Sequence, residues 1–335
     1  MPEWCVEQGI GEDRAALIDG DTILAARLCW REAMRAGAVV QARLDHRHAG
    51  TRRGAVQLPD GTIALIDALT PEMTSGARLM VRITRAALAE QGRFKLALCR
   101  PAGDAPPSPA PTLAQTLVQT VAQTGHSVRV AGMLDRTLDN AGWPDLAEQA
   151  VSGQVDFAAG RLTISPTPAM TLIDIDGPPP LAPLALAAAS AVARTLARLD
   201  IAGSVGIDFP GQESRSQRQA VDGALAAALA AQGWHGERTG MNGFGFVQLI
   251  SRLERPSLVA RMAFYPARAA AHVLLRAAER VEGAGALLLT AHPAVLGAID
   301  AAMETELARR SGREIRRAPR ERLALHAGFA QAVAP

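Results

Sequence analysis

Hydrophobic and polar residues alternate in short runs through the first hundred positions, a pattern typical of β-strands. Residues 14–28 predict two strands around a turn at Asp19 and Gly20. Turn signals such as Ser75–Gly76 also divide residues 37–98 into short segments. We expect five strands there, and five strands in so short a segment are typical of a small OB-type barrel. The expected strands are 38–44, 54–58, 62–69, 78–88 and 93–99.

A segment rich in Pro and Ala, residues 101–111, ends this β region and predicts a linker. A polar helix over 112–124 follows. From residue 161 the pattern changes to alternating strands and helices, which predicts an α/β fold. The expected strands are 161–165, 170–176, 203–209, 285–291, 313–317 and 322–328, and the expected helices are 184–199, 213–232, 267–282 and 293–311.

Composition narrows the function only slightly. The chain has 335 residues, 48% of them hydrophobic, which is enough for more than one domain. A formal net charge of +2 excludes a strongly basic or acidic tail but neither requires nor forbids nucleic acid. The three cysteines are far apart and fit a reducing cytoplasm. The sequence shows no signal peptide and no membrane-length apolar run, so we expect a cytoplasmic protein without membrane contact.

The most informative segment is Thr-Leu-Ile-Asp-Ile-Asp, residues 171–176. Side chains alternate along a strand, so Asp174 and Asp176 share one face. A helix and a further strand ending at Asp208 complete a β-α-β unit, which brings the carboxyl ends of the two strands together. Asp174 and Asp208 are then expected to lie within reach of one ion, and oxygen ligands favour Mg²⁺ or Mn²⁺. Spacing alone favours the alternative, in which these aspartates are strand-end turn and capping residues.

The wider sequence resembles the ribonuclease E/G family. Residues 171–176 are similar to its T-x-I-D-[VI]-N strand, and residues 185–209 follow its next helix and I-D-F strand without a gap. Residues 245–249 resemble its G-L-[VM]-E-[LM] element, and residues 255–258 match an R-P-S-L of some members. The resemblance is strongest over 155–258 and extends over most of the chain.

This resemblance implies a mixed α/β and α+β multidomain fold. An OB-type RNA-binding barrel is expected at 36–100, followed by the linker at 101–111. A ribonuclease-H-like part is expected from 1–35, joined by about 112–160. A deoxyribonuclease-I-like α/β catalytic core is expected at 161–258 and a small C-terminal αβ domain at 259–335.

The activity implied is metal-dependent cleavage of single-stranded RNA by an endoribonuclease. Asp174 and Asp208 correspond to the two aspartates that bind Mg²⁺ (or Mn²⁺). Asp176 is a third catalytic candidate, because it stands where the family has an asparagine that orients the first aspartate. The arginines expected to contact RNA are Arg215, Arg218 and Arg252 in the core and Arg47, Arg52 and Arg53 in the barrel.

Several residues depart from the family pattern. Gln248 stands where the family has glutamate, and Ser251 where it has arginine. No cysteine lies beyond Cys99, so we expect no zinc and no zinc-linked tetramer, and a homodimer through the core instead. The short interval 101–154 implies that the domain reading a 5′-monophosphate is missing, and Phe94 is the only aromatic residue between 37 and 98.

These departures keep two other hypotheses open. One is an RNA-binding protein of weak or no catalytic activity on the same scaffold. The other is a metal-dependent phosphohydrolase of small phosphoesters, which retains the aspartates and needs no surface for base stacking.

Overall fold

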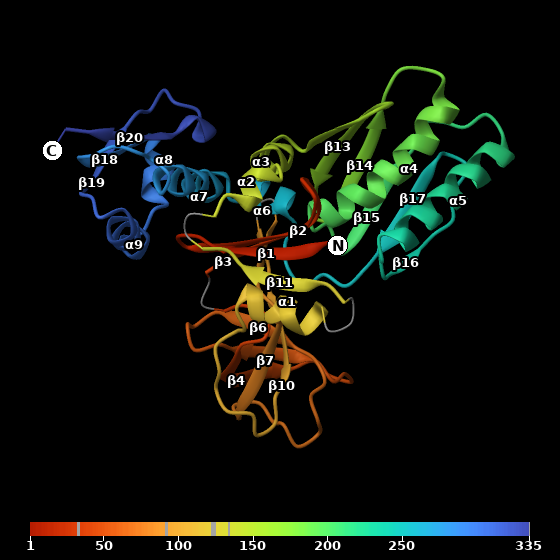
Figure 1. The fold of residues 1–335 in the computed structure, drawn as a ribbon. Helices are drawn as coiled ribbons and strands as arrows, with labels where there is room; N and C mark the ends of the chain where they lie inside the picture. The colour runs from red at the N-terminus through yellow and green to blue at the C-terminus, as the bar shows by residue number, and fades with distance from the viewer. Residues whose placement is uncertain (32–33, 91–92, 122–124, 133–134, 335) are drawn as a thin grey trace.

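The computed structural model describes residues 1–31, 34–90, 93–121, 125–132 and 135–334, and it confirms a mixed α/β chain. A four-stranded sheet lies at the centre, with a closed barrel below it (Figure 1). A six-stranded sheet with its helices lies to the upper right, and a three-stranded sheet to the upper left. The chain therefore builds several small units around a central sheet.

The central sheet has the strand order β11-β1-β2-β3. The predicted hairpin is confirmed as β2 and β3, each longer than the alternation suggested. β11 comes from the segment after the linker and pairs in parallel with β1. Helix α1 packs against this sheet through Leu113 and Leu117, and the predicted helix end at 122–124 lies outside the described residues. The bounds are β1 Glu3–Gln8, β2 Glu12–Asp19, β3 Thr22–Trp30, α1 Leu113–Val121 and β11 Ser127–Val130.

The barrel closes through five strands in the order β10-β6-β5-β4-β7. β10 pairs in parallel with β6 and antiparallel with β7, which completes the ring. This closed five-stranded topology is consistent with the OB-type barrel predicted from the turn spacing. The bounds are β4 Val39–Arg47, β5 Gly54–Gln57, β6 Ile63–Ile66, β7 Arg78–Arg85 and β10 Ala97–Pro101; a separate hairpin pairs β8 Leu88–Glu90 with β9 Arg93–Lys95.

The six-stranded sheet has the order β12-β13-β14-β15-β17-β16 and carries the predicted β-α-β unit. Ile173 and Ile175 of β14 are buried beneath the helices, whereas Leu172, Asp174 and Asp176 are exposed on the opposite face. Helices α4 and α5 thus cover one face and leave the other open. The bounds are β12 Gln154–Phe157, β13 Gly160–Pro166, β14 Thr171–Asp176, α4 Leu181–Arg198, β15 Ser204–Asp208, α5 Arg215–Ala231, β16 Glu237–Arg238 and β17 Phe246–Ile250.

Helix α4 is the one helix among the described residues that is long and apolar enough to cross a membrane. Half of this segment is buried inside the protein. Ala185, Ala188 and Ala189 are fully buried, and such small side chains allow the helix to approach the sheet closely. We therefore interpret α4 as a core helix that satisfies the same length and composition test.

The central and six-stranded sheets share one hydrophobic core, so they are not independent units. Trp30 of β3, Leu146 of α3 and Leu162 of β13 belong to one buried cluster, together with Leu258 of α6. The helices that complete this junction are α2 Thr137–Asn140, α3 Trp143–Ser152, α6 Leu258–Phe264 and α7 Pro266–Ala278.

The C-terminal sheet places β18 Ala286–Ala291 between β19 Ile315–Pro319 and β20 Phe329–Val333. The helix predicted over 293–311 is wrong as a single element. It divides into α8 Pro293–Gly297 and α9 Ala301–Ser311, because Asp300 caps a new helix by accepting the amide of Met303 at 2.8 Å. The last strand also lies later than predicted, since Leu325–Ala327 forms a short 3₁₀ turn.

Candidate functional site

The two aspartates expected to bind metal are direct neighbours on the open face of the six-stranded sheet. Asp174 of β14 stands opposite Asp208 of β15 in the parallel register. Both occupy exposed positions; Asp208 is the last residue of β15, and Asp174 lies two residues before the end of β14. Asp176 lies two residues beyond Asp174 on the same face, opposite Arg161 of β13. The predicted crossover therefore brings Asp174 and Asp208 together, with Asp176 beside them.

The start of α5 lies at the same end of the sheet. Ser214 caps this helix and forms a capping box with Gln217, whose side chain returns to the Ser214 amide. Arg215 is then the first helical residue and is exposed, while the Arg218 guanidinium donates to the Gln212 carbonyl at 3.2 Å. Both arginines follow Asp208 by a short loop, so they add positive charge near the end of β15.

The electrostatics of the aspartate pair favour a cation. Burial raises the pKa of the Asp174 carboxyl above its ordinary value, and the negative charge of Asp176 raises it further. The Ile175 amide donates to Asp174 Oδ1 at 3.0 Å and opposes this shift, while Asp208 adds to it. A positive ion between the carboxylates would relieve this repulsion.

The donor set fits Mg²⁺ better than a metal that needs a complete protein cage. Among the described residues, no group of three or more His, Cys, Asp or Glu side chains is arranged to hold an ion. Two carboxylates are nevertheless the number that Mg²⁺ commonly takes from protein in phosphate chemistry, with water and substrate oxygens as its other ligands. Asp174 and Asp208 would supply those two carboxylates.

An aromatic side chain that sequence reasoning missed lies beside the pair. Phe246 of β17 stands opposite Asp208 in the antiparallel register. A Cβ placed on Gly206 would meet Phe246 Cζ at 2.5 Å and the Leu172 side chain at 3.0 Å, so the ring lies across β15 only because residue 206 is glycine. The alternation of Phe246, Gln248 and Ile250 with buried Val247 and Leu249 was the signal that could have found it.

Gly245 fixes the position of this ring. Its φ of +88° lies in the left-handed region, and a Cβ there would meet the Phe209 carbonyl oxygen at 2.6 Å. The Phe209 amide in turn donates to the Gly245 carbonyl at 3.2 Å. The preceding residue, Phe244, is 89% exposed, so two aromatic side chains stand at the end of the sheet that carries the aspartates.

Gln248 does not reach the aspartates. It lies on the open face opposite Gly206, and its amide nitrogen donates to Ser204 Oγ at 3.2 Å. Ser204 is at the beginning of β15, whereas Asp208 is at its end. The position where the family has glutamate is thus occupied by a neutral side chain that bonds away from the site.

Arg252 is the predicted RNA contact that the fold does not bring to the site. β17 runs antiparallel to β15, so Ile250 faces Ser204 and the chain leaves the sheet at the opposite end from Asp208. Ser251 accepts the Gly203 amide at 3.2 Å there, and Arg252 pairs with Glu254 at 3.3 Å. Ser204 and Asp208 are four residues apart along β15, which is about 13 Å at the usual rise of a strand.

The barrel arginines hold the barrel together. Arg47 donates to three backbone carbonyls of the loop before β7, those of Thr70, Pro71 and Met73. Arg52 donates to the Leu69 carbonyl at 3.2 Å, and Arg53 pairs with Asp67 at 2.9 Å. Arg52, Arg53 and the exposed Arg100, which sequence reasoning did not single out, line one shallow depression of the barrel surface.

Sequence comparison finds no protein-family model that matches the chain and no curated protein that matches it. The resemblance to the ribonuclease E/G family therefore stays a prediction from the motifs.

Proposed function

We propose that the open face of the six-stranded sheet is the active site of a metal-dependent phosphodiesterase. The observation that carries this proposal is the register of Asp174 and Asp208, which places two carboxylates side by side near the carboxyl ends of parallel strands. Together with α4 and α5 on the other face, this sheet is proposed to be the deoxyribonuclease-I-like core that the motifs imply.

The particular activity we propose is endonucleolytic cleavage of single-stranded RNA. A Mg²⁺ or Mn²⁺ ion held by Asp174 and Asp208 would polarise the phosphate and promote attack by water. Arg215 and Arg218 would bind the flanking phosphates from the start of α5. Asp176 would add negative charge beside the ion and strengthen its binding.

Phe246 supports single-stranded nucleic acid as the substrate class. An aromatic ring beside the aspartates offers a surface on which an unpaired base can stack, and stacking contributes about 1–3 kcal/mol per base. In the barrel region, residues 37–98, the sequence supplies one aromatic side chain, Phe94, which lies on the separate β8–β9 hairpin and is 65% exposed. The base-stacking surface would therefore lie mainly on the catalytic sheet.

The direct test measures cleavage of a fluorescent single-stranded RNA by the full chain in Mg²⁺ or in EDTA. We expect cleavage only with Mg²⁺, and we expect the Asp174→Asn plus Asp208→Asn double variant to lose at least about 100-fold in rate. Asp145→Asn, an exposed aspartate in the first turn of α3, is the matched control. Equal rates for the wild type and the double variant would refute the proposal.

The second candidate is an RNA-binding protein without turnover, and Gln248 is the observation that favours it. The carboxylate expected at this position is replaced by an amide that bonds to Ser204. Salt-dependent binding of RNA without cleavage would support this candidate. Hydrolysis of a nitrophenyl phosphate without RNA binding would instead support a phosphohydrolase of small phosphoesters.

Location and assembly remain part of the same proposal. We expect a cytoplasmic protein, because its substrate would be cellular RNA. We also expect a homodimer through the catalytic core, and sedimentation of the purified chain would test that assembly.

A further inference from the structure

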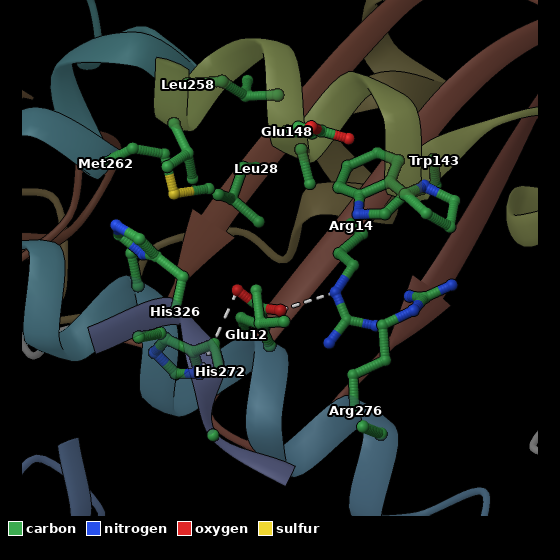
Figure 2. Close-up of a pocket in the computed structure, with 18 of the residues that line it drawn as sticks. Glu12, Arg14, Leu28, Trp143, Glu148, Leu258, Met262, His272, Arg276 and His326 are labelled. Atoms are coloured by element: carbon green, nitrogen blue, oxygen red, sulfur yellow. Dashed lines mark hydrogen bonds and ion pairs between the residues drawn. The ribbon is translucent and has the colours of Figure 1, made fainter. Parts of the chain in front are cut away.

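A cavity of about 730 Å³ lies away from the aspartates, where four parts of the chain meet. Its lining comes from strands β2 and β3 of the central sheet, from helices α2 and α3, from helices α6 and α7, and from the C-terminal residues His326 and Gly328 (Figure 2). These elements are far apart in the sequence, so only the folded chain forms the cavity. The volume is in the range of pockets that bind small molecules.

The walls of this cavity are mainly apolar. Leu28, Leu258 and Met262 form one side, and Trp143 lies across the cavity from them (Figure 2). Val151 of α3 and Val273 of α7 also line it and are 37% and 48% exposed. A ligand that removes apolar surface of this kind from water is stabilised by about 25 cal/mol per Å² of buried area.

The floor holds a buried carboxylate that is fully partnered. Glu12 is 4% exposed; its Oε1 accepts from Arg14 Nε at 2.5 Å, and its Oε2 accepts from Trp30 Nε1 at 3.1 Å. Figure 2 shows Glu12 between Arg14 on one side and His272 on the other. Its charge is therefore already satisfied within the protein.

The remaining charges of the floor also balance. Glu7 accepts from Arg14 at 2.6 Å and from Arg276 at 2.5 Å. Asp139 accepts from Arg276 at 2.5 Å and pairs with Arg280. Burial and the neighbouring Arg14 lower the pKa of Arg276 to about 10, so it stays charged at neutral pH. The three arginines thus match the carboxylates of Glu7, Glu12 and Asp139.

His272 adds no charge to this balance. Its Nδ1 donates to the Ile10 carbonyl at 3.2 Å, and its ring stacks on Trp30 with the centroids 5.3 Å apart. Burial lowers the pKa of His272 and outweighs the nearby Glu12 carboxylate. The ring is therefore neutral near pH 7, and the floor carries no net charge.

We propose that this cavity is a binding site for an uncharged, largely apolar small molecule. The apolar walls favour such a ligand. An anion would lose its water without gaining a counter-charge, because each arginine of the floor is already paired with a carboxylate. Among the described residues of the lining, a cation would meet only Glu148 outside these pairs, and its carboxylate is exposed to solvent and therefore screened. This site is separate from the proposed RNA site and does not depend on it.

Three naphthalene probes that differ only in their head group test the charge of the preferred ligand. Calorimetric titration of the full chain compares naphthalene-2-carboxamide, the anionic naphthalene-2-carboxylate and the cationic 2-naphthylmethylammonium. We expect the amide to bind at least about 10-fold more tightly than either ion, a difference of about 1.4 kcal/mol. Equal or tighter binding of an ion would overturn the proposal, and so would the absence of amide binding.

Two substitutions locate the binding. Ala147→Trp from α3 and Val273→Trp from α7 each place an indole in the cavity without touching the buried charges. Ala227→Trp on the exposed side of α5 is the matched control. Circular dichroism shows which of the two cavity variants folds. A folded variant should bind naphthalene-2-carboxamide at least about 10-fold more weakly than the wild type. Unchanged binding in a folded variant would place the ligand elsewhere and overturn the proposal.

Discussion

Asp174 and Asp208 lie side by side in the parallel register of β14 and β15, at exposed positions on the sheet face opposite helices α4 and α5. The two aspartates belong to different strands, and Asp208 comes more than thirty residues after Asp174 in the sequence. Burial raises the pKa of Asp174, and the negative charges of Asp176 and then Asp208 raise it further, so ionised Asp174 destabilises the metal-free folded protein at neutral pH.

Asp174→Asn should therefore raise the melting temperature of the metal-free protein at pH 7. The raised pKa means that this group contributes stability below its ordinary pKa, about pH 4, and loses it as the pH rises through the folded value. The gain should stay below about 1 kcal/mol, because the carboxylate is mostly exposed and screened. The side-chain oxygen of asparagine can still accept the hydrogen bond from the Ile175 amide.

Thermal unfolding in EDTA at pH 4 and pH 7 measures this effect. The difference between variant and wild type should widen with pH. Added Mg²⁺ should raise the melting temperature of the wild type but not that of the Asp174→Asn plus Asp208→Asn variant. A destabilised Asp174→Asn variant at pH 7 would show that the carboxylate has a structural partner instead.

Phe246→Ala should weaken binding of single-stranded RNA by about 5- to 150-fold, the equivalent of one stacked base. Fluorescence anisotropy with a short labelled RNA measures the change. Phe329→Ala, on the distant strand β20 where the ring is 46% exposed, is the matched control and should bind like the wild type. Equal RNA affinities for the two variants would show that Phe246 does not contact the RNA.

Arg215→Gln should reduce the salt dependence of RNA binding. Each phosphate contact contributes about 0.7 to the slope of log affinity against log salt for single strands. Arg252→Gln serves as the control, because Arg252 lies at the other end of the sheet and should leave the slope unchanged. The opposite ranking of the two slopes would move the RNA path to the Arg252 end.

Asp200→Asn should destabilise the protein by about 3 kcal/mol, the lower end of the range for breaking a buried ion pair, because it leaves two partly buried arginines without their counter-charge. Asp200 is 8% exposed and pairs with Arg255 at 2.6 Å and with Arg27 at 3.2 Å. Burial alone would raise its pKa, but these two arginines outweigh it and hold the pKa below its ordinary value. The stability that this triad contributes is therefore present above about pH 4 and is lost as the pH falls further.

Denaturant titration at pH 7 checks the magnitude, and acid titration checks the sign. Glu254→Gln is the control, since Glu254 is half-exposed and its ion pairs with Arg252 and Arg255 should contribute less than about 1 kcal/mol. A loss from Asp200→Asn no larger than that of the control would contradict the buried-triad interpretation.

Much of the local structure follows from sequence pattern. The hairpin of β2 and β3, the barrel strands β4, β5 and β6 and the unit β14-α4-β15 were predicted, because alternation and turn residues act over a few neighbouring positions. The predicted strands 78–88 and 93–99 are only partly right, since each divides between a barrel strand, β7 or β10, and the separate β8–β9 hairpin. The division of 293–311 into α8 and α9 was missed, because the apolar spacing continues across the break. The signal was Asp300, a strong N-cap in the middle of an apparent helix.

The sequence by itself determined that Asp174 and Asp176 share a face and that a β-α-β crossover brings Asp208 to the same sheet edge, since alternation and handedness are local rules. Only the tertiary structure decided what surrounds them. The antiparallel direction of β17 brings Phe246 beside Asp208 and sends Arg252 to the far end. The cavity around Glu12 likewise exists only where four separate segments pack together, and no pattern along a single segment contains that relationship.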